Sequence, residues 1–331
     1  MSSPYDWYES LYWVFTHLCN DQCAHCYNDS SPHGERMPLE DCLAVVANLP
    51  ERIDRLILSG GEPLTERPKL YAILDALRER YRGETQIMLQ TNGDLLTGEI
   101  LDELIARGVT RFDIASIDRF HKHAGARKDV LELLFKSRGM VDDATTPLIE
   151  KETYLKRGVL SYGFWGANED FWIGGNWARG EAMRQNTWLR DGRHNFCSVL
   201  SGGKGFLGGT DLPQEISIQL WRINPCCPGT KHALGDARTE KVAEVIERVA
   251  KSPIFQKINE GDPYAMGETI GIPREAGVER AVALQNVCLW CDEFFDRHFD
   301  LATLEPRDPA DLENTGPPPE PAARPILPIV P

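Results

Sequence analysis

The sequence predicts an α/β protein built on a parallel sheet. Two observations support this prediction: short apolar runs alternate with longer amphipathic stretches through the first 160 residues, and polar motifs follow the apolar runs. Repeated strand–helix units form a parallel sheet with right-handed crossovers, whose functional loops lie at the carboxyl ends of the strands. With 331 residues, 42% of them hydrophobic, the chain can bury one large core or two smaller ones.

Strands and helices are predicted to alternate in order along this part of the chain. The predicted strands are Leu11–Thr16, Arg55–Leu58, Thr85–Gln90, Arg111–Ala115 and Pro147–Leu155. The predicted helices are Pro38–Leu49, Lys69–Tyr81, Gly98–Arg107 and Val130–Met140. Cys42 falls on the apolar face of the first helix, so we expect it to pack in the core.

The pattern changes after Gly158, where glycine and tryptophan become dense. The periodic signal weakens there, and we expect an irregular second module with a strand at Glu215–Ile223 and one clear helix at Thr239–Lys251. The stretch from Pro306 to Pro331 holds nine of the 22 prolines, a composition typical of a disordered or polyproline tail.

The charge balance and hydropathy narrow the classes of function. With 36 basic and 50 acidic residues the formal net charge is −14, which argues against a protein that binds nucleic-acid phosphates. No stretch of 18 apolar residues occurs and no secretory signal is visible at the N-terminus, so we expect a cytoplasmic protein that does not act on membranes. Because disulfides are rare in the cytoplasm, we expect the nine cysteines to bind metal or act in catalysis rather than to form disulfides.

Three cysteines lie close together after the first predicted strand, in Cys19-Asn-Asp-Gln-Cys23-Ala-His-Cys26. Thiolates with this spacing converge on one metal centre, and three of them on a four-iron cluster leave one iron free for an outside chelator. The alternative is a zinc site completed by His17, His25 or His33, although structural zinc more often staples small domains.

Three further motifs follow the next three predicted strands. They are Gly60-Gly61-Glu62-Pro63, Thr91-Asn92-Gly93 and Ser116-Ile117-Asp118. Taken singly, such motifs are ordinary turns and helix caps. With the cysteines, at four successive strand ends, they make the chain resemble the radical S-adenosylmethionine (radical SAM) enzymes over about its first 200 residues.

The resemblance implies a partial (β/α)6 TIM-like barrel. Cys19, Cys23 and Cys26 would hold a [4Fe–4S] cluster whose open iron is chelated by S-adenosylmethionine, and His25 would shield the cluster. Reductive cleavage of this nucleotide gives a 5′-deoxyadenosyl radical that abstracts hydrogen from an unactivated C–H bond. The residues expected to bind S-adenosylmethionine are Gly60, Gly61, Glu62, Asn92, Ser116, Asp118 and Arg179. Glu62 would accept a hydrogen bond from the methionyl amine or brace the loop, and Arg179 would pair with a carboxylate such as the methionyl one.

The later cysteines resemble an auxiliary-cluster domain of the Twitch or SPASM type. Its expected ligands to a second [4Fe–4S] cluster are Cys197, Cys226, Cys288 and Cys291, with a zinc site or a buried cysteine pair as the alternative for the last two. The following Cys227 would then be a free thiol that donates a hydrogen atom, with the reverse assignment of Cys226 and Cys227 left open. The implied organisation is a radical SAM barrel over 1–195, an auxiliary domain over 196–304 and a proline-rich tail over 305–331.

Chains of this layout resemble the dehydrogenases and epimerases of aminoglycoside biosynthesis. The implied substrate is an aminoglycoside or sugar-like small molecule, which a negative cleft would attract if cationic, and the implied reductant is a flavodoxin- or ferredoxin-type protein. His121 and Glu152 are candidate bases for a substrate hydroxyl. The alternatives are a radical SAM peptide maturase and a non-catalytic zinc or iron–sulfur protein.

Overall fold

The protein is described by a computed structural model over residues 3–115, 124–142, 159–164, 177–199 and 203–307. A nine-stranded sheet in the order β5-β6-β4-β3-β2-β1-β7-β8-β9 organises this part of the chain. Its strands are β1 (Trp7–Val14), β2 (Arg52–Ser59), β3 (Gln86–Thr91), β4 (Val109–Ile114), β5 (Val141–Asp142), β6 (Ser161–Phe164), β7 (Glu215–Gln219), β8 (Arg222–Asn224) and β9 (Gly235–Asp236). The fold is therefore mixed α/β, as predicted.

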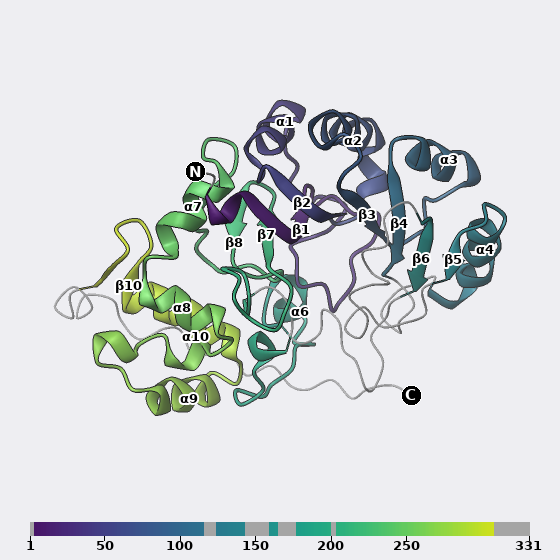
Figure 1. The fold of residues 1–331 in the computed structure, drawn as a ribbon. Helices are drawn as coiled ribbons and strands as arrows, with labels where there is room; N and C mark the ends of the chain where they lie inside the picture. The colour runs from purple at the N-terminus through teal and green to yellow at the C-terminus, as the bar shows by residue number, and fades with distance from the viewer. Residues whose placement is uncertain (1–2, 116–123, 143–158, 165–176, 200–202, 308–331) are drawn as a thin grey trace.

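In the order of the sheet, the neighbouring strands from β5 through β1 to β7 all pair in parallel. Among the described strands of this sheet, β8 and β9 pair antiparallel. The sheet curves into an open arc, with four helices along its outer face (Figure 1). These helices are α1 (Leu39–Asn48), α2 (Arg67–Tyr81), α3 (Gly98–Ala106) and α4 (Ala124–Lys136). Because crossover helices cover only one side of a curved sheet, the other side faces an inner space, as in a partial barrel.

Side chains alternate between these two faces of the sheet. Leu11 and Trp13 of β1 belong to the large core beneath the helices, whereas Tyr12 and Val14 point to a separate small cluster with Ile57 and Met88 on the inner face. Cys227 packs against this inner cluster from outside the first four strands. The period of two along each strand therefore selects which residues line the inner space.

The strand and helix predictions before residue 142 agree with the structure within a few residues, except that α4 begins earlier than expected. The predicted strand Pro147–Leu155 lies outside the described residues. Cys42 of α1 is fully buried, as predicted. No helix in the described ranges has the length and hydropathy needed to cross a membrane.

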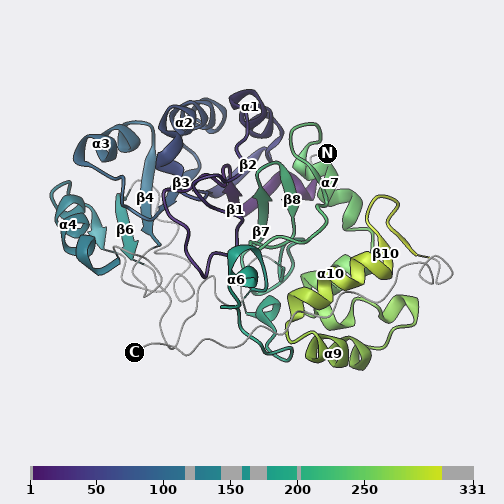
Figure 2. The same cartoon turned by 180° about the vertical axis from the view of Figure 1, so that it is seen from behind.

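The predicted helix Thr239–Lys251 is confirmed, but the region after Gly158 holds more helices than expected. Besides α7 (Val242–Val249), the region holds α6 (Gly180–Arg184), α8 (Pro253–Asn259), α9 (Arg274–Ala283) and α10 (Val287–Arg297), followed by the short pair β10 (Phe299–Asp300) and β11 (Glu305–Pro306). Figure 1 and Figure 2 show α9 and α10 as a group beside the β7–β8 end of the sheet, and Figure 1 shows α8 with them. Among the helices of this region, α6 and α8 have only five and seven residues, too few to show an apolar period, and α9 contains Gly277.

The predicted strand Glu215–Ile223 is a hairpin in the structure. Leu220 adopts a left-handed backbone conformation (φ 56°) and its amide donates to the carbonyl of Val14, so the chain reverses between β7 and β8. Left-handed turns usually carry glycine, and a leucine gives no such signal. Through β7, which pairs with β1, the segment after residue 195 continues the same sheet.

Candidate active site between two cysteine groups

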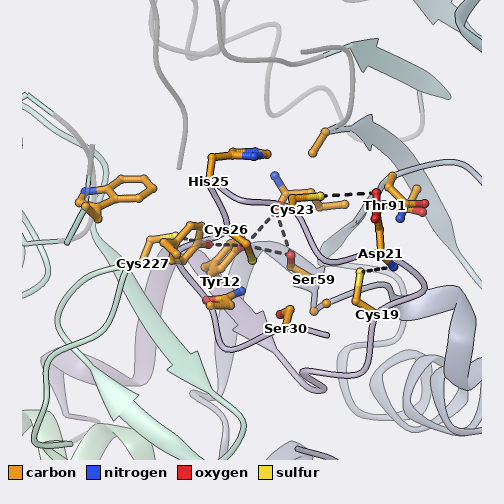
Figure 3. Close-up of a pocket in the computed structure, with 18 residues that line it drawn as sticks. Tyr12, Cys19, Asp21, Cys23, His25, Cys26, Ser30, Ser59, Thr91 and Cys227 are labelled. Atoms are coloured by element: carbon orange, nitrogen blue, oxygen red, sulfur yellow. Dashed lines mark hydrogen bonds between the residues drawn. The ribbon is translucent and has the colours of Figure 1, made fainter. Parts of the chain in front are cut away.

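A cavity of about 190 Å³ opens at the carboxyl ends of β1, β2 and β3 (Figure 3). Cys19, Cys23 and Cys26 all line it, as do His25 and Cys227. Of the three histidines considered as zinc ligands, His25 alone is among the residues lining this cavity, and His33 is exposed.

The three N-terminal thiols are shielded from water and influence one another. Burial raises the pKa of Cys19 to about 12, and the charge of Cys26 contributes to this rise. Burial likewise raises the pKa of Cys23, with added repulsion from Asp21, Cys26 and Cys19. Three thiols this close in one pocket are chemically suited to bind several metal ions together.

The backbone amides of Gly61 and Glu62 hold the start of the cysteine loop in place. The Gly61 amide donates to the carbonyl of Thr16 at 2.7 Å, and the Glu62 amide donates to the carbonyl of Leu18 at 2.8 Å. A Cβ atom on Gly61 would stand 2.5 Å from the Leu18 carbonyl oxygen. Glycine is therefore required here because two backbones touch, directly before Cys19.

Glu62 braces two strand ends. Its fully buried carboxylate accepts hydrogen bonds from the Leu64 amide (2.9 Å), the Thr91 hydroxyl (2.7 Å) and the Asn92 amide (2.8 Å). Burial raises its pKa to about 7 even though these three donors lower it. Of the two roles predicted for Glu62, the observed contacts are those of a brace.

Asn92 connects the third strand end to the cysteine loop. Its side-chain amide donates to the Asn20 side chain at 2.8 Å, and its carbonyl oxygen accepts the Asp94 amide at 3.0 Å. Asn92, Gly60 and Gly61 all line the cavity, as expected for residues that bind a ligand there.

A chain of hydroxyl groups crosses the cavity wall to Cys227. The Tyr27 hydroxyl lies 3.2 Å from the Cys227 sulfur and 3.0 Å from the hydroxyl of Tyr12. The Tyr12 hydroxyl lies within hydrogen-bond distance of the Gln90 side-chain oxygen (2.8 Å) and of the Ser59 hydroxyl (2.9 Å). Sequence reasoning missed Tyr12, Tyr27, Ser59 and Gln90. A signal was present, since polar residues at inward-facing positions near the ends of successive strands are unusual in a buried parallel sheet.

The other four predicted cluster ligands come together elsewhere. Burial raises the pKa of Cys226, and the charges of Cys197, Cys288 and Cys291 raise it further. Gly203 joins two of the segments: its amide donates to the Pro225 carbonyl at 2.7 Å, and the space beside it holds the Cys197 side chain. Cys288 and Cys291 lie one turn apart on α10.

Arg179 lies with this second group and is absent from the lining of the cavity. Its guanidinium forms two 2.9 Å contacts with the carboxylate of Asp292, next to Cys291, and donates to the Cys288 carbonyl at 3.3 Å. The expectation that Arg179 pairs with a carboxylate agrees with the structure, but its partner is Asp292 of the chain itself.

Several predicted site residues lie outside the described ranges. They are Ser116, Asp118, His121 and Glu152. Among the described residues, no three Cys, His, Asp or Glu side chains converge at the spacing of a single metal ion.

Comparison with known proteins identifies the N-terminal region. Residues 13–134 match the protein-family model of the radical SAM superfamily. Residues 13–134 of this chain are therefore a radical SAM region, which makes up about a third of its length. Members of the superfamily are enzymes that use a [4Fe–4S] cluster, S-adenosylmethionine and a reductant, so the family assignment agrees with the cavity at the end of β1.

The curated relatives match about a third of this chain. The AdoMet-dependent heme synthase of Methanosarcina barkeri is 42% identical over 113 residues, which cover 32% of this chain and 30% of that protein. The GTP 3′,8-cyclase of Campylobacter jejuni subsp. doylei is 30% identical over 124 residues, 35% of this chain and 38% of the cyclase. The matches thus span about a third of these curated relatives. A crystal structure of BtrN in complex with AdoMet and 2-DOIA aligns with 77% of this chain and 88% of its own, at 15% identity and a TM-score of 0.47.

The first cysteine group fits the radical SAM cluster. Cys19, Cys23 and Cys26 offer three thiols to one cavity, and the donor number matches a four-iron cluster with one open iron. Those three residues would hold the cluster, and Gly60, Gly61 and Asn92 line the space where the nucleotide would lie. When bound, the cluster and S-adenosylmethionine together supply the radical that takes a hydrogen atom from the substrate.

Proposed function

We propose that this radical SAM enzyme epimerises a carbinol carbon of an aminoglycoside or related sugar or cyclitol, with Cys227 as the hydrogen-atom donor. The observation that carries the proposal is the location of the Cys227 thiol, which lines the same cavity as Cys19, Cys23 and Cys26. A fourth thiol in this cavity, not needed to bind the cluster, can donate a hydrogen atom to a substrate radical. Simple oxidation to a ketone requires no such thiol.

The proposed step balances as a hydrogen-atom transfer. The S–H bond of Cys227 breaks, a C–H bond forms on the opposite face of the substrate carbon, and sulfur is left one electron short. One electron and one proton then restore the thiol. The Tyr27 hydroxyl, at 3.2 Å from the Cys227 sulfur, fixes the position of this sulfur within the cavity.

The polar wall supports a hydroxylated small molecule as substrate. Tyr12, Ser59 and Gln90 line the cavity with hydroxyl and amide groups. Hydroxyl groups of a sugar or cyclitol form hydrogen bonds with such a surface. The net charge of −14 favours a cationic substrate.

A second cluster would supply the electron that restores Cys227. We propose that Cys197, Cys226, Cys288 and Cys291 hold an auxiliary [4Fe–4S] cluster, since four thiols from three chain segments gather there. Cys226 ligates and the neighbouring Cys227 stays free in this proposal. We propose with it a division into a barrel (1–195) and an auxiliary region (196–304), and an electron donor of the flavodoxin or ferredoxin type. The predicted tail (305–331) begins with Glu305–Pro306, which pair with β10 in the structure.

Product analysis in deuterated water tests the proposal. The reconstituted enzyme is incubated under reducing conditions with S-adenosylmethionine and a panel of aminoglycosides and cyclitols, and the products are examined for inversion and deuterium at one carbon. We expect deuterium from the wild type, loss of the epimer in Cys227→Ala with unchanged iron content, and loss of iron in the neighbouring Cys226→Ala.

Two outcomes contradict epimerisation. A ketone that Cys227→Ala still produces indicates a dehydrogenase. Turnover of a peptide, with no turnover of the panel, indicates the peptide-maturase alternative.

A further inference from the structure

The guanidinium of Arg179 is fixed beside the second cysteine group. Besides its paired contacts with Asp292, it donates from Nη2 to the Cys288 carbonyl and from Nε to the Gly229 carbonyl, both at 3.3 Å. Asp292 is held in turn by the Lys231 amide at 3.1 Å. The side chains of Arg179 and Asp292 are 14% and 17% exposed, so both charges are largely removed from water.

The segment that carries Arg179 is locked against the first cysteine loop. A Cβ atom on Gly180 would stand 2.4 Å from the Asn28 carbonyl oxygen, and the Ala182 amide donates to the Cys26 carbonyl at 2.8 Å. The ring of Trp177 meets Tyr27 edge to face at 4.9 Å. Arg179 therefore stands at a fixed place between the two cysteine groups and has little freedom to move away.

A fixed charge near a redox centre changes the energy of its reduction. Adding an electron makes the centre more negative, so a neighbouring cation favours the reduced state and a neighbouring anion favours the oxidised state. The Coulomb interaction is strong because both charged side chains are shielded from solvent.

We propose that the Arg179–Asp292 pair sets the reduction potential of the auxiliary cluster, with Arg179 raising it and Asp292 lowering it. The proposal rests on the auxiliary cluster proposed above. It assigns Arg179 a positioning and tuning role toward this cluster, in place of the S-adenosylmethionine contact expected from the sequence. The two residues act in opposite directions, which a purely structural role for the pair does not predict.

A redox titration of the isolated auxiliary signal tests the proposal. In a full-length protein with Cys19, Cys23 and Cys26 all replaced by alanine, the remaining cluster is titrated anaerobically and followed by EPR. Arg179→Gln and Asp292→Asn are compared in this background. Arg184→Gln, on the same segment but paired with the exposed Asp29, serves as the matched control.

We expect Arg179→Gln to lower and Asp292→Asn to raise the reduction equilibrium constant, each at least tenfold, which is 59 mV for a one-electron couple. Arg179→Lys keeps the charge and should shift the potential less than Arg179→Gln, and Arg184→Gln should leave it unchanged. Iron content checks that each variant holds its cluster.

Each contrary result has a distinct meaning. Equal potentials in all variants, or shifts in the same direction for Arg179→Gln and Asp292→Asn, overturn the tuning role while the cluster stands. A background protein without bound iron overturns the auxiliary cluster itself, and the tuning role with it.

Discussion

The two cysteine groups are built in opposite ways. Cys19, Cys23 and Cys26 lie within eight residues on one loop, which is held by backbone contacts from Gly61 and Glu62. The second group gathers cysteines from positions 197, 226, 288 and 291, and the Arg179–Asp292 ion pair lies beside it. A local site depends on close backbone contacts, whereas a dispersed one depends on the packing of distant segments.

The largest effect is expected when the cysteines of one group at a time are replaced by alanine, which tests whether the two groups have separate roles. Replacing Cys19, Cys23 and Cys26 by alanine removes the open iron that S-adenosylmethionine needs, so we expect 5′-deoxyadenosine formation to fall by at least about three orders of magnitude. Replacing Cys288 and Cys291 should leave measurable 5′-deoxyadenosine while epimer formation stops. Chromatographic assay of the nucleoside checks both. Equal loss in the two variants would contradict separate roles for the two groups.

The difference between the groups also explains what the sequence could reveal. The loop cysteines and the motifs at Gly60 and Thr91 were predictable because each is contiguous and follows a periodic strand. The role of Gly61 could not be predicted, because Gly61 contacts the Leu18 backbone and only the fold brings these two residues together.

Contacts between distant segments were the least predictable feature. Arg179 was expected to meet a nucleotide but pairs with Asp292, 113 residues away in sequence. Tyr12 and Tyr27 were missed because their hydroxyls meet only when β1 and the cysteine loop are folded. Helix α8, with seven residues, lacks the length over which an apolar period becomes visible.

A second test perturbs the local group through its backbone support. In Gly61→Ala the new methyl group overlaps the Leu18 carbonyl, so the cysteine loop must shift. We expect loss of the iron bound at the first group, measured by the ferrous assay, with the auxiliary EPR signal retained. Gly83→Ala is the control: its left-handed backbone (φ 80°) makes alanine costly by about 1 kcal/mol, but no atom stands within 4 Å of the new Cβ. Equal iron loss in both variants would argue against a specific loop contact.

The buried carboxyl group of Glu62 predicts that the stability of the protein depends on pH. Burial raises the pKa of Glu62 to about 7 from an unfolded value of 4.5, so the folded state binds the extra proton between these values. The contribution of Glu62 to stability is therefore greatest at low pH and declines as the pH rises toward 7. Relative to Glu62→Gln, we expect the wild type to lose on the order of 3 kcal/mol between pH 4.5 and pH 7.

Thermal unfolding of the two proteins across this pH range measures the effect. Asp94 is the charged neighbour that contributes to the raised pKa, and Asp94→Asn should reduce the pH dependence slightly. A constant difference in Tm between wild type and Glu62→Gln at all pH values would show that the carboxyl group does not titrate there.

The smallest effect is expected for a cysteine that belongs to neither group. Cys42 is fully buried on α1 within the main core. Its replacement by alanine should cost about 1 kcal/mol of stability, with no change in bound iron or in 5′-deoxyadenosine formation. Denaturant unfolding and iron analysis check this, and a loss of iron would place Cys42 in a cluster site after all.

Metal analysis of the anaerobically purified and reconstituted protein tests the central claim most directly. If the two cysteine groups each hold a four-iron cluster, the wild type contains about eight irons and eight sulfides per chain, and the variant without Cys19, Cys23 and Cys26 about four of each. Zinc in place of iron, or a variant with the same iron content as the wild type, would contradict the account.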